Sequence, residues 1–389
     1  MTPPACGGWS TPSVVARLTR PLLLGVALVV LVAGCRSVTP ERFGVLNPRL
    51  GELLLVGFHG TTLQGSAQLE SLLCETRVAG VILFARNIVN AEQTARFTRE
   101  LIARARECTG QPLLVAVDAE GGRVMRLGPA AGWTPTPSHQ ELGQAGDLAQ
   151  TELEARRIGG MLREAGINWN LAPVVDVGYN PANPVIVGVG RAFSANPERV
   201  AAQARAYITG MHEAGILTAL KHFPGHGSSV ADSHAGFVDV TDTARPDVEL
   251  VPYRLLLADG LVDAVMTAHV YNRHIDAWVP ATLSRRTVDG LLREQLGWRG
   301  VVVSDDMRMG AIEQHYGAGD AAVRALRAGV DLVLIADDRL PDGRSASSDA
   351  LKAIRRAVRH GKLPTARVDE ALGHIDALRS RLTPPTEVR

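Results

Sequence analysis

The sequence predicts an α/β protein, built as a single (β/α)8 barrel of the TIM type. Three observations support this prediction. From about Leu46 onward, eight short apolar runs alternate with longer amphipathic stretches. The runs are continuous, as is usual for strands of a parallel sheet that is covered on both faces. No Pro/Ser-rich hinge or internal repeat divides the chain. The same elements would also allow an open, doubly wound sheet, which is the alternative.

Residues 1–34 are predicted to be a signal peptide and are set aside from the fold. Arg17 and Arg20 supply positive charge ahead of an uncharged apolar run over 21–34. That run is short for a bilayer span, which takes about 20 residues. It ends in Leu31-Val-Ala-Gly-Cys35, which resembles a bacterial lipobox. The resemblance implies lipidation of Cys35 and export to a bacterial membrane, on its periplasmic or cell-surface face. A generic signal peptide, or an anchor helix with an incidental cysteine, is the alternative.

The eight apolar runs are the expected strands. In chain order they are 53–57, 80–84, 113–118, 168–173, 217–221, 264–268, 300–304 and 331–336. We expect them to belong to one catalytic domain over residues 48–382, with 383–389 as a frayed tail.

The amphipathic stretches between the runs are the expected helices. The stretch 90–109 shows the pattern, because Asn90 suits an N-cap, Phe97 and Leu101 lie on one face, and Gly110 suits the end. Similar patterns cover 147–165, 196–214, 287–296, 319–328 and 345–360.

The composition excludes two classes of protein. The chain has 389 residues with 41 Lys+Arg and 40 Asp+Glu, so it lacks the basic surplus usual in a nucleic-acid binder. Only 4 cysteines are present, which excludes a small disulfide-stapled scaffold. After export, Cys74 and Cys108 would meet an oxidising compartment, where they form either a disulfide or two separate, partly buried thiols.

Polar side chains follow four of the predicted strands. Asp118 follows the third run, Lys221 and His222 the fifth, His269 the sixth, and Ser304-Asp305-Asp306 the seventh. In a barrel of parallel strands these positions meet at one face, where active sites lie. The sequence therefore predicts an active site at the carboxyl ends of the strands.

The segment 221–234 contains the richest set of polar residues. Asp232 and His234 are two residues apart, so their side chains leave an extended loop on the same side. The carboxylate would then orient an imidazole that gives and takes a proton. The alternative is a local hydrogen bond that only shapes a turn.

Four segments together resemble glycoside hydrolase family 3, in its bacterial β-N-acetylglucosaminidase (β-hexosaminidase) branch. The resemblance runs from about residue 48 to about residue 380. Its segments, in the family's order, are Asp118-Ala-Glu-Gly-Gly-Arg-Val-Met-Arg126, Gly190-Arg191-Ala-Phe-Ser194, Lys221-His-Phe-Pro-Gly-His-Gly227 with Asp232-Ser-His234, and Ser304-Asp305-Asp306-Met-Arg-Met-Gly-Ala311.

The resemblance implies a role for each matching residue. Asp305 takes the position of the catalytic nucleophile, and His234 that of the general acid/base, with Asp232 as its partner. The matching positions that hold the hydroxyls of N-acetylglucosamine are Asp118, Arg126, Arg191, Lys221 and His222.

The implied reaction is release of terminal, non-reducing N-acetylglucosamine with retention, through a glycosyl-enzyme. The implied natural substrates are peptidoglycan fragments, or muropeptides. No cofactor, metal or nucleic acid is expected, and we expect a monomer. The loop 225–236, which begins with Gly225 and Gly227, is expected to move His234 into place.

Other functional interpretations of the same residues stay open. One is a β-glucosidase-like or phosphorolytic member of the family. Another assigns catalysis to the substrate's own acetamido group, in which an adjacent acidic pair such as Asp305 and Asp306 takes part. A third is a sugar-binding lipoprotein without activity, and a fourth is a metal-dependent hydrolase that uses the histidines 222, 226, 234 and 269. We interpret His226 as a residue that fixes its loop and His269 as a support for the site.

Overall fold

The computed structural model describes residues 47–382 of the chain. The predicted signal peptide (1–34), Cys35 and the predicted tail (383–389) lie outside the described residues. Within the described range, no helix combines the length and the apolar character needed to cross a bilayer.

Each of the eight predicted apolar runs contains a strand of a parallel sheet. One six-stranded group has the order β13-β1-β2-β3-β6-β7, and a three-stranded group has the order β12-β10-β8. Isolated parallel bridges, Val303 to Leu332 and Val174 to Lys221, occur where these groups adjoin. The strands are β1 (Leu54–Gly57), β2 (Gly80–Leu83), β3 (Leu114–Val117), β6 (Trp169–Asn170), β7 (Leu217–Thr218), β8 (Leu220–Phe223), β10 (Ala264–Thr267), β12 (Val301–Val303) and β13 (Val333–Ile335).

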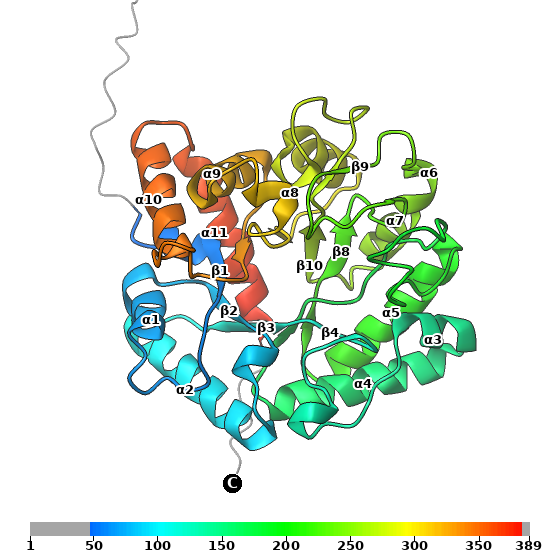
Figure 1. Cartoon of the computed structure of the whole chain (residues 1–389), viewed down its shortest axis with the longest axis horizontal. Helices are drawn as coiled ribbons and strands as arrows, with labels where there is room; N and C mark the ends of the chain where they lie inside the picture. The colour runs from blue at the N-terminus through cyan, green and yellow to red at the C-terminus, as the bar shows by residue number, and fades with distance from the viewer. Residues whose placement is uncertain (1–46, 383–389) are drawn as a thin grey trace, which may run out of the picture. The chain divides into compact units, whose positions relative to one another are not determined.

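These strands give the described part of the chain a TIM-barrel-like α/β fold, in which helices surround the strands (Figure 1). The nine strands are almost entirely buried, as the continuous apolar runs predicted. Closure into a complete (β/α)8 barrel stays a prediction.

The six predicted helices are present, within one or two residues of the expected bounds. Asn90 caps the first of them by accepting a hydrogen bond from the Gln93 N–H at 2.8 Å, and Gly110 ends it with a φ of 74°. The six are α2 (Ala91–Thr109), α4 (Leu148–Glu164), α5 (Pro197–Glu213), the π-helix η6 (Arg286–Gln295), α9 (Ala318–Ala328) and α10 (Ala346–Arg359).

Further helices were not predicted. The longest of them, α11, buries the arginine Arg379 against Glu52, so its inner face is not purely apolar. The α-helices in this set are α1 (Ala67–Glu70), α3 (His139–Ala145), α6 (Pro246–Glu249), α7 (Val251–Ala258), α8 (Gly310–Glu313) and α11 (Thr365–Ser380); the other short helices are η1 (Leu50–Leu53), η2 (Ser71–Thr76), η3 (Ala85–Asn87), η4 (Pro129–Ala131) and η5 (Ala281–Leu283).

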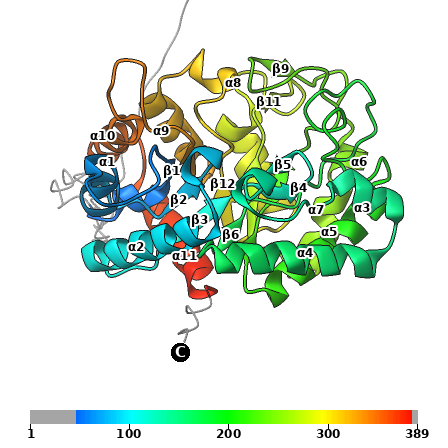
Figure 2. The same ribbon diagram turned by 60° about the horizontal axis from the view of Figure 1, so that its bottom comes forward.

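Two small strand pairs lie in loops that follow the central strands. β4 (Ala119–Gly121) pairs antiparallel with β5 (Val124–Met125), and β9 (Val238–Asp239) pairs parallel with β11 (Val270–Tyr271). Figure 2 shows β9, β11 and α8 together on one side of the molecule. The β9–β11 pair joins the loop that contains His234 to the loop after β10.

Cys74 and Cys108 form a disulfide, with Cα atoms 5.0 Å apart. The bond connects η2 to the last turn of α2. The sequence left open a disulfide or two separate thiols, and the structure has the disulfide.

Candidate active site

The polar residues predicted at the strand ends do come together. Asp118 follows β3 directly, Lys221 and His222 lie within β8, and Asp305 follows β12 after Ser304. Contacts link neighbouring ends: Lys221 Nζ lies 2.9 Å from Asp118 Oδ1, and His269 Nε2 lies 2.9 Å from the carbonyl oxygen of Asp306. One face of the fold therefore carries the candidate site.

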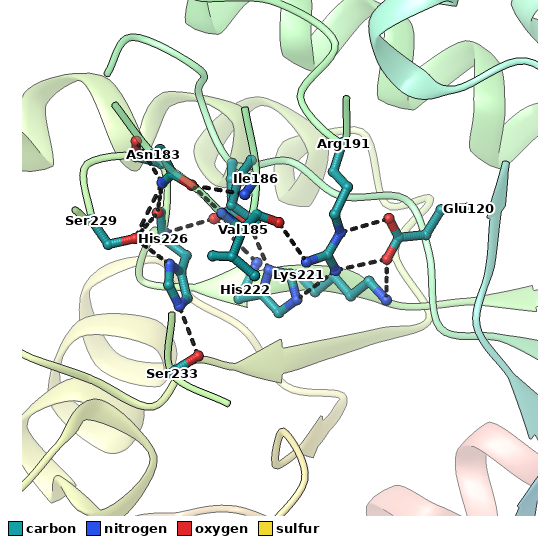
Figure 3. A network of polar contacts seen from close by, with 12 residues as sticks. Glu120, Asn183, Val185, Ile186, Arg191, Lys221, His222, His226, Ser229 and Ser233 are labelled. Carbon is teal, nitrogen blue, oxygen red and sulfur yellow. Dashed lines mark hydrogen bonds and ion pairs between the residues drawn. The ribbon is translucent and has the colours of Figure 1, made fainter. Parts of the chain in front are cut away.

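A buried cluster of alternating charges, which we call the charged wall, contains Asp118, Glu120, Arg191 and Lys221. Figure 3 shows the last three in contact. Lys221 Nζ lies 2.7 Å from Glu120 Oε1 in addition to its contact with Asp118. Arg191 binds the same Glu120 with two parallel hydrogen bonds, of 2.9 Å from Nε and 2.8 Å from Nη2. Such two-pronged pairing fixes the plane of the guanidinium as well as its position.

The charges in this wall stabilise one another against burial. Burial opposes ionisation of Asp118, but Lys221 and Arg126 outweigh it and lower the pKa of this carboxyl. Burial likewise opposes ionisation of Glu120, yet Arg191 and Lys221 hold its pKa well below the usual value. Lys221 has a raised pKa, because the two carboxylates outweigh the effect of its burial. All three groups are thus charged near neutral pH.

Arg126 lies at the open side of the cluster. Its Nη2 is 3.5 Å from Asp118 Oδ2, and a third of its side chain is exposed. It is therefore placed to reach a bound ligand while Asp118 holds it.

His222 lies between a carboxylate and a guanidinium group. Its Nδ1 lies 2.7 Å from Asp176 Oδ2, and Arg191 Nη2 donates to its Nε2 at 3.2 Å. Because Nε2 accepts, Nδ1 carries the hydrogen and donates it to the carboxylate. Asp176 also accepts from the peptide N–H of His226 at 2.7 Å, so one buried carboxylate orients two parts of the site.

Asp305 is a carboxylate that directly follows Ser304 at the end of β12. Its Oδ1 accepts a hydrogen bond from the Asp306 N–H at 2.8 Å. Within residues 47–382, no Lys, Arg or His nitrogen lies within 4.0 Å of its oxygens. Burial would raise its pKa, but the nearby imidazoles of His222 and His269 lower it to about 2. The side chain is thus ionised, and it has no ion-pair partner among the residues that the structure describes.

Asp306 has a structural position instead. Its Oδ1 accepts from the N–H groups of Ala336 at 2.8 Å and Arg308 at 3.0 Å, which ties β12 to the end of β13. Burial raises its pKa to about 6. The two adjacent aspartates therefore differ in their hydrogen-bond partners and in the direction in which their pKa values are shifted.

His234 and Asp232 form a contact in the loop after β8. His234 Nδ1 lies 2.7 Å from Asp232 Oδ1, which also accepts from the His234 N–H at 2.9 Å. This pair faces solvent, because 62% of the His234 side chain is exposed. Its loop is attached to α8, since the Ala311 N–H donates to the Ser233 carbonyl at 3.2 Å.

His226 is buried and engaged on both ring nitrogens. Nδ1 lies 2.6 Å from Ser229 Oγ, and Nε2 lies 3.0 Å from Ser233 Oγ (Figure 3). Burial lowers its pKa to about 4, so the ring is neutral. Within residues 47–382, no group of three or more His, Cys, Asp or Glu side chains is arranged to hold a metal ion.

Three polar residues of the site had no predicted role. Glu120 was visible in the sequence two positions after Asp118, on the same side of an extended segment. Asp176 directly follows the apolar segment Leu171–Val175, and nothing else in the sequence indicated a role for it. Asn183 Nδ2 donates to the His226 carbonyl at 2.7 Å, a contact across 43 positions that no local pattern shows.

Comparison with known proteins identifies the family. Residues 45–378 match the model of the glycosyl hydrolase family 3 N terminal domain. The chain belongs to glycoside hydrolase family 3. A beta-hexosaminidase of Xylella fastidiosa is 42% identical to this family 3 chain over 313 residues, which are 78% of the chain and 87% of the relative. A beta-hexosaminidase of Stenotrophomonas maltophilia is 39% identical over 315 residues, or 77% and 90% of the two chains.

Solved structures of family 3 enzymes have the same fold. A β-N-acetylglucosaminidase from a Paenibacillus species superposes with a TM-score of 0.81 at 40% identity, covering 87% of this chain and 62% of the longer Paenibacillus chain. A β-N-acetylhexosaminidase from Beutenbergia cavernae gives a TM-score of 0.79 at 33% identity, over 86% and 98% of the two chains. The predicted family and the predicted enzyme class, a glycoside hydrolase, are confirmed.

Proposed function

We propose that this family 3 enzyme is a retaining exo-β-N-acetylglucosaminidase in which Asp305 is the nucleophile. The observation that carries the proposal is the state of Asp305, a carboxylate with a pKa of about 2 at the end of β12 and without an ion-pair partner among the described residues. A retaining glycosidase needs such a group on one side of the bond and a proton donor on the other. The names of the relatives support N-acetylhexosamine as the sugar.

In the first step, an Asp305 oxygen bonds to the anomeric carbon as the bond from that carbon to the leaving oxygen breaks. His234 gives its proton to the leaving oxygen. Because Nδ1 of His234 is occupied by Asp232 at 2.7 Å, Nε2 is the nitrogen that faces the substrate. The Asp232 carboxylate stabilises the imidazolium that must exist before this transfer.

In the second step, His234 Nε2 accepts a proton from water, and the hydroxide formed attacks the anomeric carbon. The ester bond to Asp305 breaks, and its carboxylate is restored. Two displacements on the same carbon give retention of configuration.

The charged wall holds the terminal sugar. Lys221, Arg126 and Arg191 are donors to hydroxyl oxygens, and Asp118 is an acceptor. Donors that carry charge form the stronger hydrogen bonds. Glu120 holds Lys221 and Arg191, and Asp118 contacts Lys221 and Arg126. Because these contacts exist before substrate arrives, few side chains have to be ordered on binding.

The natural substrates in this proposal are muropeptides, cleaved by a monomer that is exported and anchored through Cys35. The Cys74–Cys108 disulfide supports export, because disulfides persist in oxidising compartments. Replacement of Cys35 by Ala should abolish incorporation of labelled fatty acid and release the enzyme from the membrane fraction. Fatty-acid labelling that is unchanged in Cys35→Ala would refute the anchor.

A trapping experiment tests the nucleophile. A fluorinated N-acetylglucosaminide with slow turnover should leave one sugar on the peptide that contains Asp305, as seen by mass spectrometry. Asp305→Asn should abolish both the adduct and turnover. Asp306→Asn is the matched control, and it should still form the adduct on Asp305. An adduct on another residue, or turnover that survives Asp305→Asn, would overturn the assignment.

A further inference from the structure

Two aromatic side chains of this structure are left in solvent, and they lie in adjoining loops. Phe237 is 52% exposed and Trp278 is 86% exposed. Within residues 47–382, no other phenylalanine or tryptophan is exposed. Large aromatic rings in water usually indicate a binding surface.

We define an aromatic rim as Phe237, Tyr271, Trp278 and His315. Ring contacts link Phe237 to Tyr271 and His315, and Trp278 is next in sequence to a residue that Tyr271 contacts. The rings of Phe237 and Tyr271 are 5.2 Å apart, and that of His315 lies 6.4 Å from Phe237. The Tyr271 hydroxyl donates to the carbonyl of Ala277, the residue before Trp278, at 3.0 Å. The β9–β11 pairing holds the two loops side by side.

The aromatic rim is next to the proton donor of the proposed mechanism. Phe237 is three residues beyond His234, and His315 follows α8, which begins five residues after Asp305. The Gly310 N–H at the start of α8 donates to the His234 carbonyl. Figure 2 shows β9, β11 and α8 on one side of the molecule. Because the acid must touch the leaving oxygen, a surface beside it borders the leaving group.

We propose that the aromatic rim binds the leaving group as a sugar ring, stacked on Phe237. The inference rests on the function proposed above and adds a subsite to it. The C–H groups on the face of a pyranose ring carry partial positive charge, and the face of an aromatic ring is negative. The enzyme thereby selects a glycan in which a second ring follows the terminal N-acetylglucosamine.

Two glycosyl donors distinguish binding in this subsite from acid catalysis. The β-1,4-linked disaccharide of N-acetylglucosamine has a leaving ring, whereas methyl β-N-acetylglucosaminide has none, and both have a poor leaving group that needs the proton of His234. The measurement is the ratio of kcat/KM for the disaccharide to kcat/KM for the methyl glycoside. Phe237→Leu, which keeps an apolar side chain but removes the ring, should lower this ratio about tenfold. Phe237→Tyr, which keeps an aromatic ring, should leave the ratio at the value of the unaltered enzyme.

Leu153→Ala is the matched control, since Leu153 is 56% exposed on α4 and away from the rim, and it should leave the ratio unchanged. An unchanged ratio in Phe237→Leu overturns the inference, as does an equal loss on both donors, which would mean a displaced His234. If Phe237→Leu had unchanged kinetics but bound anionic phospholipid vesicles more weakly than the unaltered enzyme, the inference would also be overturned. The rim would then be a membrane contact. Inactivity of the unaltered enzyme on both donors would instead refute the proposed function.

Discussion

The peptide N–H of Gly310 donates a hydrogen bond of 3.2 Å to the carbonyl oxygen of His234. A second bond of 3.2 Å runs beside it, from the Ala311 N–H to the Ser233 carbonyl. The residue proposed as acid/base is therefore attached to the segment that follows the proposed nucleophile, Asp305. The position of one proposed catalytic group therefore constrains that of the other, although 71 positions separate them in the sequence.

Gly310→Ala tests this attachment. A Cβ atom at position 310 would lie 2.8 Å from the His234 carbonyl oxygen and 2.9 Å from the Ala235 carbonyl carbon, so the loop must move. We expect kcat/KM for a substrate with a poor leaving group to fall about 100-fold, because a displacement near 1 Å has effects of this size. A substrate with a good leaving group needs little acid assistance and should be affected much less.

Gly317→Ala is the control for this substitution. A Cβ atom there meets nothing within 4 Å and φ is −75°, so steady-state kinetics should be unchanged. Equal losses on both kinds of substrate in Gly310→Ala would contradict the proposed link to His234.

Glu120→Gln tests the buried charged wall. The substitution removes the charge that Arg191 and Lys221 share, and it leaves both cations buried with one partner fewer. Removing one partner from a buried ion pair costs about 3–5 kcal/mol of unfolding free energy. We expect a loss of this size in urea denaturation, together with a raised KM.

The exposed pair of Arg156 and Glu213 gives the comparison. These side chains are 51% and 42% exposed, so Glu213→Gln should cost at most about 1 kcal/mol. Similar losses for Glu120→Gln and Glu213→Gln would contradict the importance assigned to burial.

The disulfide should contribute to stability but not to catalysis. Cys74 and Cys108 are 34 positions apart, and a cross-link over a loop of that length stabilises by about 4 kcal/mol. Cys108 lies in the last turn of α2, which precedes β3 in the chain, so the bond lies at the end of the strands opposite the site. The double variant Cys74→Ser, Cys108→Ser should unfold at a lower temperature and keep its kcat at 25 °C. A melting temperature equal to that of the unaltered enzyme would refute the prediction.

Much of the fold could be predicted because it depends on local pattern. Each apolar run contains a strand, since a strand buried on both faces must be apolar throughout. The run 217–221 was predicted as one strand, but it divides into β7, which pairs with β6, and β8, which pairs with β10. That division depends on neighbouring strands and leaves no mark in the run itself. Helix α11 was not among the predicted helices, although its buried Val368, Leu372 and Ile375 follow helical spacing.

The site could be predicted only where its contacts are short in sequence or follow from strand ends. Asp232 and His234 are two residues apart, so their contact was expected. Glu120 and Arg191 are 71 positions apart, and Asp176 and His222 are 46 apart. These pairs depend on which strand ends become neighbours. The sequence contains these four residues but does not show which of them pair in the fold.

Glu249 is a buried carboxyl beneath the loop of the acid/base. It is 4% exposed, and its side chain packs against Gly225, where a Cβ atom would lie 2.8 Å from it. Tyr179 Oη donates to its Oε1 at 3.1 Å, and the Arg245 N–H donates to Oε2 at 3.3 Å. Burial, with a smaller effect of the negative charge of Asp176, raises the pKa of Glu249 to about 7.

This pKa predicts a loss of stability as the pH rises. The unfolded chain releases the proton of Glu249 near pH 4.5, whereas the folded protein keeps it until about pH 7. Between these values each pH unit destabilises the folded state by about 1.4 kcal/mol, or about 3 kcal/mol in all. Glu249→Gln has nothing to ionise, so between pH 5 and pH 8 its unfolding free energy should fall by about 3 kcal/mol less than that of the unaltered enzyme. The buried histidines His139 and His226 titrate in both proteins. Their contributions therefore cancel when the unfolding free energy of one protein is subtracted from that of the other. Parallel curves of unfolding free energy against pH would show that Glu249 is ionised in the folded state throughout this range.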